Sequence, residues 1–346
     1  MIEVKELTKV YGDHTAVDRM SFKINNGKIY GLLGPNGAGK STTMNIIAGC
    51  LAPTSGTVKI NGFDIYDQPQ KAKACIGYLP EIPPLYNELT PFEYLSFVAE
   101  AKGVSHQRAL RQVHEAMELT DIDDMKDRLI KNLSKGYRQR VGIAQAMLGN
   151  PDIIILDEPT VGLDPKQIAE IRALIRKLGE MKTVIVSSHI LAEISEMCDH
   201  VLIISKGHLI ANAPLEELQS MGGDKEILKL SVRGEENAVI EALNEIPEVE
   251  SCTVLPSHED GVVRLSVSAE GEDLRDRIFF AMADRRMAVI SMEREAATLE
   301  SVFLALTEEA ERSEAEKRKA RDAEPERDGE YELIDTQNEG RGNGKA

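Results

Sequence analysis

The sequence has few of the features that would place it within a membrane or outside the cell. Its longest uninterrupted runs of aliphatic and β-branched residues, at 153–156, 183–186 and 201–204, fall far short of the roughly 20 apolar residues that span a bilayer. The N-terminus, MIEVKELTKV, has neither a charged n-region nor a continuous apolar h-region, so we expect no secretory signal. The chain is therefore not expected to cross a membrane by itself.

Cysteine pairs and an excess of basic charge are also missing. The four cysteines, Cys50, Cys75, Cys198 and Cys252, lie far apart without a CxxC pair. This argues against a disulfide framework and a zinc site, and it favours a reducing cytoplasm. The 58 acidic and 41 basic side chains give a net charge of −17. An acidic surface repels phosphate backbones, so nucleic acid is not expected as the main partner.

The composition and pattern predict a folded α/β protein. With 346 residues, 42% of them hydrophobic, the chain is long enough for two or three domains. Residues 1–220 alternate strands and helices, and the strands Ile153–Asp157 and Val184–Ser187 are nearly all aliphatic, as in a parallel sheet buried on both faces. Residues 83–150 read as wholly helical, which predicts a helical subdomain inserted into the α/β core. The other expected strands are Ile2–Val10, Ser21–Ile24, Ile29–Leu33, Val58–Ile60 and Val201–Ser205.

A second, smaller domain is expected at residues 224–307, after the paired glycines of Met221–Asp224. Its pattern is β-α-β-β-α-β, that of an α+β ferredoxin-like unit, followed by an amphipathic helix at Thr298–Leu306. The expected elements are Leu228–Val232, Glu236–Glu245, Val249–Leu255, Val262–Val267, Asp273–Arg285 and Ala288–Met292. Residues 308–346 carry 13 acidic and 8 basic side chains with few apolar ones, which predicts a helix that frays into a disordered tail.

A phosphate-binding loop follows the apolar strand Ile29–Leu33. The sequence matches GxxxxGK[ST] in the strand-loop-helix context that this motif requires. Its residues are Gly34, Pro35, Asn36, Gly37, Ala38, Gly39, Lys40, Ser41 and Thr42. Backbone N–H groups and the positive end of the following helix would cradle phosphates, with Lys40 at the β- and γ-phosphates and Ser41 as a Mg²⁺ ligand. The alternative is a glycine turn at the end of a strand.

Two acids end the strand that begins at Ile153. Asp157 is placed to hold magnesium through water, and Glu158 to orient or deprotonate an attacking water. The alternative interpretation is a buried strand that ends in two solvated acids. The phosphate-binding loop elsewhere in the chain favours the catalytic interpretation.

Three further segments accompany these motifs. They are Leu133–Arg140, with the sequence LSKGYRQR, Val161–Pro165, with the sequence VGLDP, and His189 after a strand. Ser134 and the Gly136 N–H would form a small donor nest at the start of an apolar helix, which is a second anion site. The alternative is an ordinary serine N-cap.

The ordered set resembles the ATP-binding cassette (ABC) ATPases over residues 1 to about 215. The resemblance implies a P-loop NTPase fold, ATP and Mg²⁺ as cofactors, and hydrolysis of ATP to ADP and phosphate. It also implies two cassettes arranged head to tail, with Ser134, Lys135 and Gly136 of one cassette facing the ATP of the other. Asp164 would then lie at the dimer seam.

The resemblance assigns roles to three more residues. Tyr11 would stack on adenine and His189 would contact the γ-phosphate. Glu81 stands where the family usually has a glutamine that senses magnesium and the membrane partner, so a carboxylate there adds negative charge near the triphosphate. The segment Leu133–Arg140 also departs from the LSGGQ signature of the family, with Lys135 in place of a glycine and Tyr137 in place of the glutamine.

The expected function is that of an ATP-hydrolysing subunit of an ABC transporter. The phrase Thr298–Thr307 resembles the ending of subunits that serve exporters of drugs, sodium or polysaccharide. The implied partners are a second copy or a related cassette and a separate integral membrane permease, which would place the chain at the cytoplasmic inner face of the cell membrane. The transported substrate and its direction stay open.

Two other functions also use a phosphate-binding loop of this kind. A non-transport cassette ATPase acting as a mechanical clamp on DNA or the ribosome usually has coiled-coil insertions or tandem cassettes, and this sequence has neither. A kinase or GTPase is disfavoured because no N/TKxD motif follows the second acidic strand and a kinase needs no second phosphate nest.

Overall fold

A computed structural model describes most of the chain up to Thr307. The described residues are 1–221, 225–257, 259, 261–270, 274–295, 299–300, 302–304 and 306–307. The expected tail at 308–346 and most of the expected boundary at Met221–Asp224 lie outside them. Within this described part, no helix is both long enough and apolar enough to cross a bilayer.

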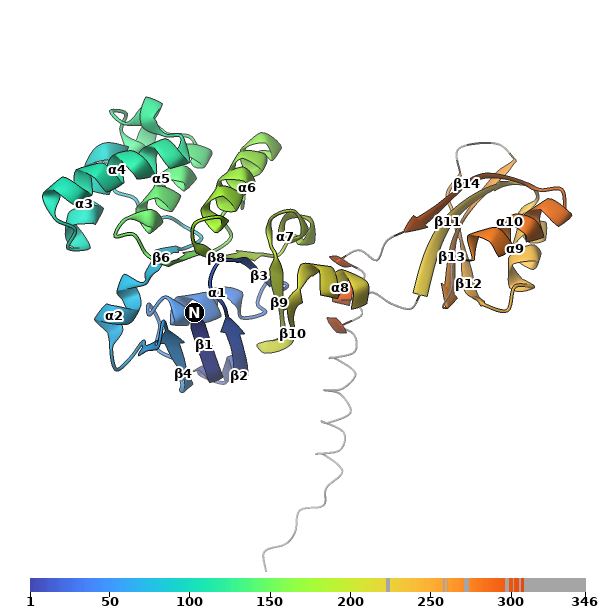
Figure 1. The fold of residues 1–346 in the computed structure, drawn as a ribbon, viewed down its shortest axis with the longest axis horizontal. Helices are drawn as coiled ribbons and strands as arrows, with labels where there is room; N and C mark the ends of the chain where they lie inside the picture. Colours follow the sequence, from blue (N-terminus) through green and yellow to red (C-terminus); the bar gives the residue numbers. More distant parts are fainter. Residues whose placement is uncertain are drawn as a thin grey trace, which may run out of the picture. The chain divides into compact units, whose positions relative to one another are not determined.

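The first 221 residues form a mixed α/β structure (Figure 1). The strands are β1 Ile2–Tyr11, β2 His14–Ile24, β3 Ile29–Leu33, β4 Ser55–Ile60, β5 Phe63–Asp64, β6 Ile76–Leu79, β7 Ile153–Leu156, β8 Thr183–Ser188, β9 His200–Ser205 and β10 His208–Pro214. The helices are α1 Lys40–Ile47, α2 Pro69–Ala74, α3 Pro91–Ala101, α4 His106–Thr120, α5 Lys135–Met147, α6 Pro165–Gly179, α7 Leu191–Met197 and α8 Leu215–Met221. The expected α/β class is confirmed by this alternation of strands and helices.

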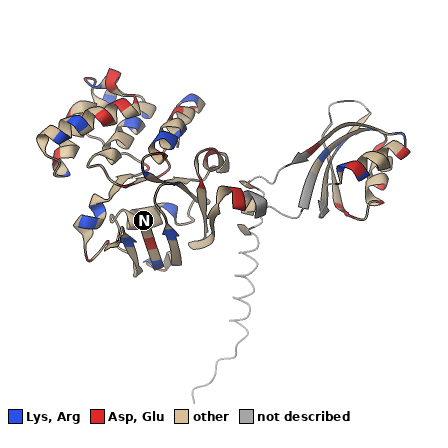
Figure 2. Cartoon of the chain, in the orientation of Figure 1, with Lys and Arg blue, Asp and Glu red and all other residues tan. Residues whose placement is uncertain are grey.

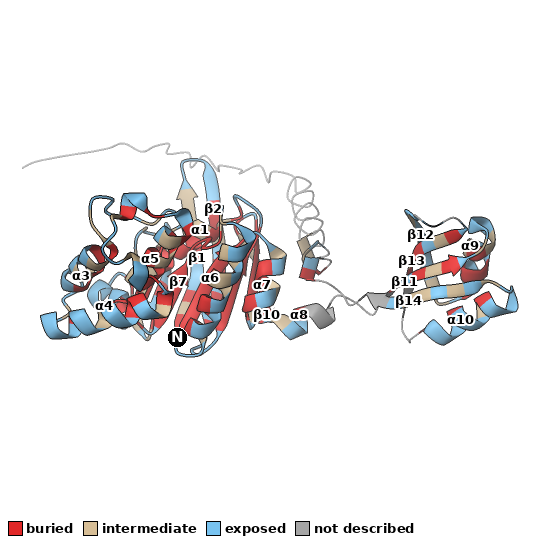
Figure 3. Cartoon of the chain, turned by 90° about the horizontal axis from the view of Figure 1, so that it is seen from above, coloured by how far each residue is buried: buried red, intermediate tan, exposed pale blue. Residues whose placement is uncertain are grey.

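A six-stranded sheet in the order β10-β9-β3-β8-β7-β6 forms the centre of this part. The five strands from β9 to β6 are parallel, and β10 pairs antiparallel with β9 at the edge. Every residue of β3, β7 and β8 is buried, because helices or a second sheet cover both faces (Figure 3). Charged side chains lie mainly on the outer helices and strands, away from these central strands (Figure 2).

The alternation of side chains along β7 divides the core into two clusters. Ile155 belongs to the cluster shared with α1 and the antiparallel sheet β2-β1-β4-β5. Ile154 belongs to the cluster shared with α6 and α7 on the opposite face. Because successive residues of a strand point to opposite faces, a short aliphatic strand can supply both cores.

Residues 83–150 contain α3, α4, α5 and two 3₁₀ helices, Asp123–Met125 and Ile130–Asn132, as the helical pattern predicted. This helical subdomain has a hydrophobic core of its own. Thr90 begins α3 with a capping box, because its hydroxyl accepts from the Glu93 N–H while the Glu93 carboxylate accepts from the Thr90 N–H.

Several elements differ from the expectation. The second strand, expected at Ser21–Ile24, begins at His14, and β5, β6 and β10 were not expected. These strands are short or polar along part of their length, so sheet pairing rather than composition determines them. The short helices α2, α7 and α8 were also missed.

The second domain has the strand order β12-β13-β11-β14, with all three pairs antiparallel. Its elements are β11 Lys225–Arg233, α9 Glu236–Asn244, β12 Val249–Leu255, β13 Val262–Glu270, α10 Arg275–Asp284 and β14 Ala288–Glu295. This is the β-α-β-β-α-β arrangement that the sequence predicted. The domain limits 1–220 and 224–307 stay predictions.

The segment after β14 contributes to the core of the first α/β part. Its described residues, between 299 and 307, are helical, whereas Thr298, Ser301 and Ala305 lie outside the description. Leu299 is 3% exposed and packs in the same cluster as residues of α6 and β9. The expected amphipathic helix is thus a packing helix over its described residues.

Candidate nucleotide site

The phosphate-binding loop connects β3 to α1. Gly39 caps the helix with a φ of 103°, and a Cβ at this position would lie 2.5 Å from the Ala16 carbonyl oxygen. Glycine is therefore required for both conformation and space. The loop ends at the N-terminus of α1, where backbone N–H groups and the helix dipole favour an anion.

The Lys40 side chain lies inside this loop, and only 6% of the residue is exposed. Its Nζ donates to the Gly34 carbonyl oxygen at 2.8 Å and to the Pro35 carbonyl oxygen at 3.3 Å. It also lies 3.4 Å from Glu158 Oε1. The structure thus brings the lysine of the first motif next to the second acid of the other motif.

Asp157 forms the other connection between the motifs. Its Oδ1 accepts from Ser41 Oγ at 3.2 Å and from Ser187 Oγ at 2.6 Å. Burial, and the nearby Asp157 carboxylate, raise the pKa of Tyr78 above its usual value. A hydroxyl and a carboxylate oxygen, side by side, form a donor set that suits Mg²⁺, which takes one or two protein ligands together with substrate phosphates.

Glu158 is 7% exposed, and its carboxylate contacts side chains on two sides. Besides the contact with Lys40, its Oε2 lies 2.9 Å from His189 Nδ1. Its backbone N–H donates to Ser187 Oγ at 2.8 Å, and its φ is 47°. A left-handed conformation is uncommon for a residue with a side chain, and such backbone strain is concentrated at functional sites.

A cavity of about 510 Å³ opens over these groups. Most of the loop lines it, together with Tyr11, Glu81, Glu158 and His189, which the sequence analysis had assigned to the same site. The lining residues are Tyr11, His14, Ala16, Asn36, Gly37, Ala38, Gly39, Lys40, Ser41, Thr42, Glu81, Glu158, Val161 and His189. The volume is in the range of small-molecule sites.

Four expected site residues do not line this cavity: Ser134, Lys135, Gly136 and Asp164. Ser134 is an N-cap of α5, since its hydroxyl accepts from the Tyr137 N–H at 3.3 Å, and Asp164 caps α6 in the same way. Gly136 lies against the Gln167 side chain, and Lys135 Nζ lies against Gly162. These residues thus form a second group, beside the loop that follows β7.

Two residues that organise the site, Ser187 and Glu193, are not among those expected from the sequence. Ser187 bonds both Asp157 and the backbone of Glu158. Glu193 is 4% exposed, and its Oε2 accepts from Thr160 Oγ1 at 2.7 Å and from Ser188 Oγ at 3.0 Å. The paired serines at the end of an aliphatic strand were a usable signal, whereas Glu193 had none.

The chain is similar to known proteins along most of its length. The family described as "ABC transporter" matches residues 17–161. The chain is 33% identical over 308 residues to the linearmycin resistance ATP-binding protein of Bacillus subtilis, covering 89% of this chain and 98% of that protein. It is 35% identical to the bacitracin transport ATP-binding protein of Bacillus licheniformis, covering 77% of this chain and 84% of that protein.

Solved structures show the same fold. An ATP-binding subunit of an ABC transporter has a TM-score of 0.58 at 32% identity, covering 64% of this chain and 92% of that chain. A dimeric ATP-binding cassette in a post-hydrolysis state with ADP and phosphate has a TM-score of 0.57 at 28% identity, covering 62% of this chain and 99% of that chain. The chain belongs to the ATP-binding proteins of ABC transporters.

Proposed function

We propose that this chain hydrolyses ATP to drive a separate membrane permease of an exporter. The observation that carries the proposal is the position of Glu158, between Lys40 and His189 and beside the Ser41–Asp157 pair. One site then contains a phosphate-binding cation, a set of Mg²⁺ ligands and a carboxylate that can accept a proton from water.

Each group of residues has a separate role in phosphoryl transfer to water. The loop N–H groups and the Lys40 ammonium stabilise the β- and γ-phosphates. Ser41 and Asp157 would hold Mg²⁺, which neutralises phosphate charge when bound, while Glu81 faces the same cavity. Glu158 orients the attacking water and accepts its proton, and His189 contacts the γ-phosphate. Tyr11, which is 46% exposed at the cavity, stacks on adenine.

The second group of motif residues supports a head-to-tail dimer. Ser134, Lys135, Gly136 and Asp164 do not line the phosphate cavity of their own subunit, so they are available to face the ATP of another cassette. A similar cassette was solved as a dimer with ADP and phosphate. The second subunit is either another copy of this chain or a related cassette.

An exposed apolar patch supports contact with a permease. Ile82 is 81% exposed, Tyr86 53% and Phe97 48%, and the Tyr86 and Phe97 rings are 5.5 Å apart. Ile82 directly follows Glu81, which lines the nucleotide cavity, so a partner bound at Ile82 could influence that cavity. Relatives named for linearmycin resistance and bacitracin transport favour an exporter, with this chain at the cytoplasmic face of the membrane.

Two experiments test the proposal. Lys40→Ala should abolish Mg-ATP hydrolysis while the chain still melts cooperatively, because Lys40 binds the phosphates. Turnover near that of the wild type would overturn the ATPase assignment.

The second experiment tests contact with the permease. The double variant Ile82→Asp/Phe97→Asp should release the chain from washed membranes of its host. Tyr66→Asp, which changes a residue 48% exposed elsewhere, should leave it bound. Equal retention of both variants would refute the patch as the docking surface.

A further inference from the structure

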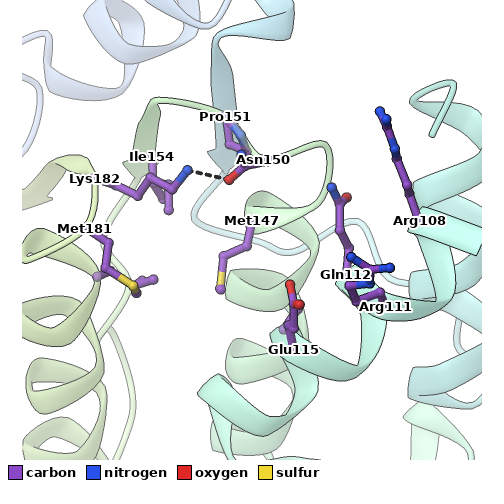
Figure 4. A pocket seen from close by; sticks show the side chains of 12 residues that line it. Arg108, Arg111, Gln112, Glu115, Met147, Asn150, Pro151, Ile154, Met181 and Lys182 are labelled. Atoms are coloured by element: carbon purple, nitrogen blue, oxygen red, sulfur yellow. Dashed lines mark hydrogen bonds between the residues drawn. The ribbon is translucent and has the colours of Figure 1, made fainter. Parts of the chain in front are cut away.

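A second cavity lies between the helical subdomain and the α/β core, on residues that the nucleotide cavity does not use. Its volume is about 350 Å³. One wall comes from α4, and the rest comes from the end of α5, the start of β7 and the turn between α6 and β8 (Figure 4). The lining residues are Arg108, Arg111, Gln112, Glu115, Ala116, Met147, Asn150, Pro151, Ile154, Leu178, Met181 and Lys182.

The rim of this cavity is basic. Arg108, Arg111 and Lys182 line it together with one acid, Glu115, in a chain whose net charge is −17. Among the described residues, neither Arg108 nor Arg111 has a carboxylate at salt-bridge distance, and both are exposed. Two guanidinium groups without a carboxylate partner favour an anion, and Arg binds carboxylates and phosphates through paired N–H groups.

The floor is apolar and contains no aromatic ring. Met147, which is half-buried, lies between the two walls, and Ile154 and Leu178, 0% and 1% exposed, back it from the core (Figure 4). Met181, 57% exposed, extends the apolar surface towards the basic rim. Aliphatic and thioether side chains suit a flexible hydrocarbon chain, whereas a nucleobase would find no ring for stacking.

Hydrogen bonds hold the walls of the cavity. Gln112 Oε1 on α4 accepts from the Gly149 N–H at 3.0 Å, so α4 is tied to the segment before β7. On the other side, Lys182 Nζ donates to Asn150 Oδ1 at 2.6 Å (Figure 4). The site is therefore largely formed before a ligand arrives, which reduces the ordering cost of binding.

We propose that this cavity binds a free single-chain amphiphilic anion, such as a medium-chain carboxylate. The acid group is bound by Arg108 or Arg111 at the rim, and the hydrocarbon chain covers Met147 and Met181. The volume is at the small end of ligand sites, so it suits one short chain and not a two-chain lipid. The site does not depend on the proposed transport function, because it shares no lining residue with the nucleotide cavity.

The test titrates the full chain with hexanoate, octanoate and decanoate by calorimetry. Affinity should rise by about two- to fourfold per added CH₂ until the cavity is filled. Nonyltrimethylammonium, with the same nonyl chain and the opposite charge, should bind at least about tenfold more weakly than decanoate. Equal affinity of these two nonyl compounds would show nonspecific apolar binding and overturn the proposal, as would no binding of decanoate.

Variants and a local probe locate the site. Arg108→Ala/Arg111→Ala should weaken decanoate binding at least about tenfold without changing the melting temperature, since both side chains are exposed. Arg128→Ala, an exposed arginine of the same subdomain outside the cavity, should bind as the wild type does. In ¹³C-methyl methionine spectra, decanoate should shift the Met147 and Met181 signals. Unchanged affinity in the double variant, or shifts confined to other methionines, would refute this site.

Discussion

Replacing Glu158 by glutamine probes both the chemistry and the electrostatics of the nucleotide site. The amide keeps the shape of the side chain but cannot accept a proton, and loss of a general base slows catalysis by roughly 10²- to 10⁴-fold. The same change removes the charge that lies 3.4 Å from Lys40 Nζ. We therefore expect slow hydrolysis together with stronger binding of Mg-ATP.

The size of the binding effect follows from that distance. At an effective dielectric constant of about 20, the attraction between the Lys40 and Glu158 charges is about 5 kcal/mol, of which desolvation offsets a large part. Without Glu158 as a competitor, Lys40 is free to bind phosphates, and the cavity loses one negative charge. A net gain of about 1–2 kcal/mol would tighten Mg-ATP binding by roughly five- to thirtyfold.

The assay combines three measurements on the wild type and Glu158→Gln. Phosphate release gives the turnover, calorimetry gives the affinity for Mg-ATP, and light scattering with and without Mg-ATP gives the oligomeric state. We expect the variant to accumulate as an ATP-bound dimer. The two subunits close more easily over ATP without the Glu158 charge, and the dimer reopens only after hydrolysis, which is slow in this variant. A strict monomer that turns over ATP at the wild-type rate would refute both the role of Glu158 and the head-to-tail dimer.

Three further predictions concern the surrounding structure. Glu193→Ala leaves the Thr160 and Ser188 hydroxyls without their buried acceptor. The free energy of unfolding should therefore fall by about 1–3 kcal/mol, and ATP turnover should also fall. Glu193→Gln should retain more of the stability and more of the turnover. Leu299→Ala should destabilise the cassette by about 2–3 kcal/mol in urea unfolding, whereas Leu304→Ala, at a position 53% exposed, should change it by less than about 0.5 kcal/mol. Burial raises the pKa of Tyr94 to about 12. As the pH rises, the unfolded state therefore loses this proton first. The free energy of unfolding should fall between pH 10 and 12, by up to about 1.4 kcal/mol per pH unit. For Tyr94→Phe, the free energy of unfolding should fall less steeply over the same range.

Contiguous motifs were readable from the sequence because they act through local geometry. The loop from Gly34 to Thr42 carries its own turn, cation and helix start, and Asp157–Glu158 directly follows an aliphatic strand. The strand and helix order of the second domain was also readable, because alternation of period two and helical periodicity are local signals. These features predicted the fold class and the residues expected to bind ATP.

The relative placement of these motifs was decided by the order of strands in the sheet. Because β8 lies between β3 and β7 and all three are parallel, their carboxyl ends meet at one edge. This brings Ser187 to Asp157, 30 positions away in the chain, and His189 to Glu158. The basic cavity depends in the same way on tertiary packing, since α4 and the turn before β8 meet only in the folded chain. No local pattern encodes such contacts, because they depend on which distant segments the hydrophobic core packs together.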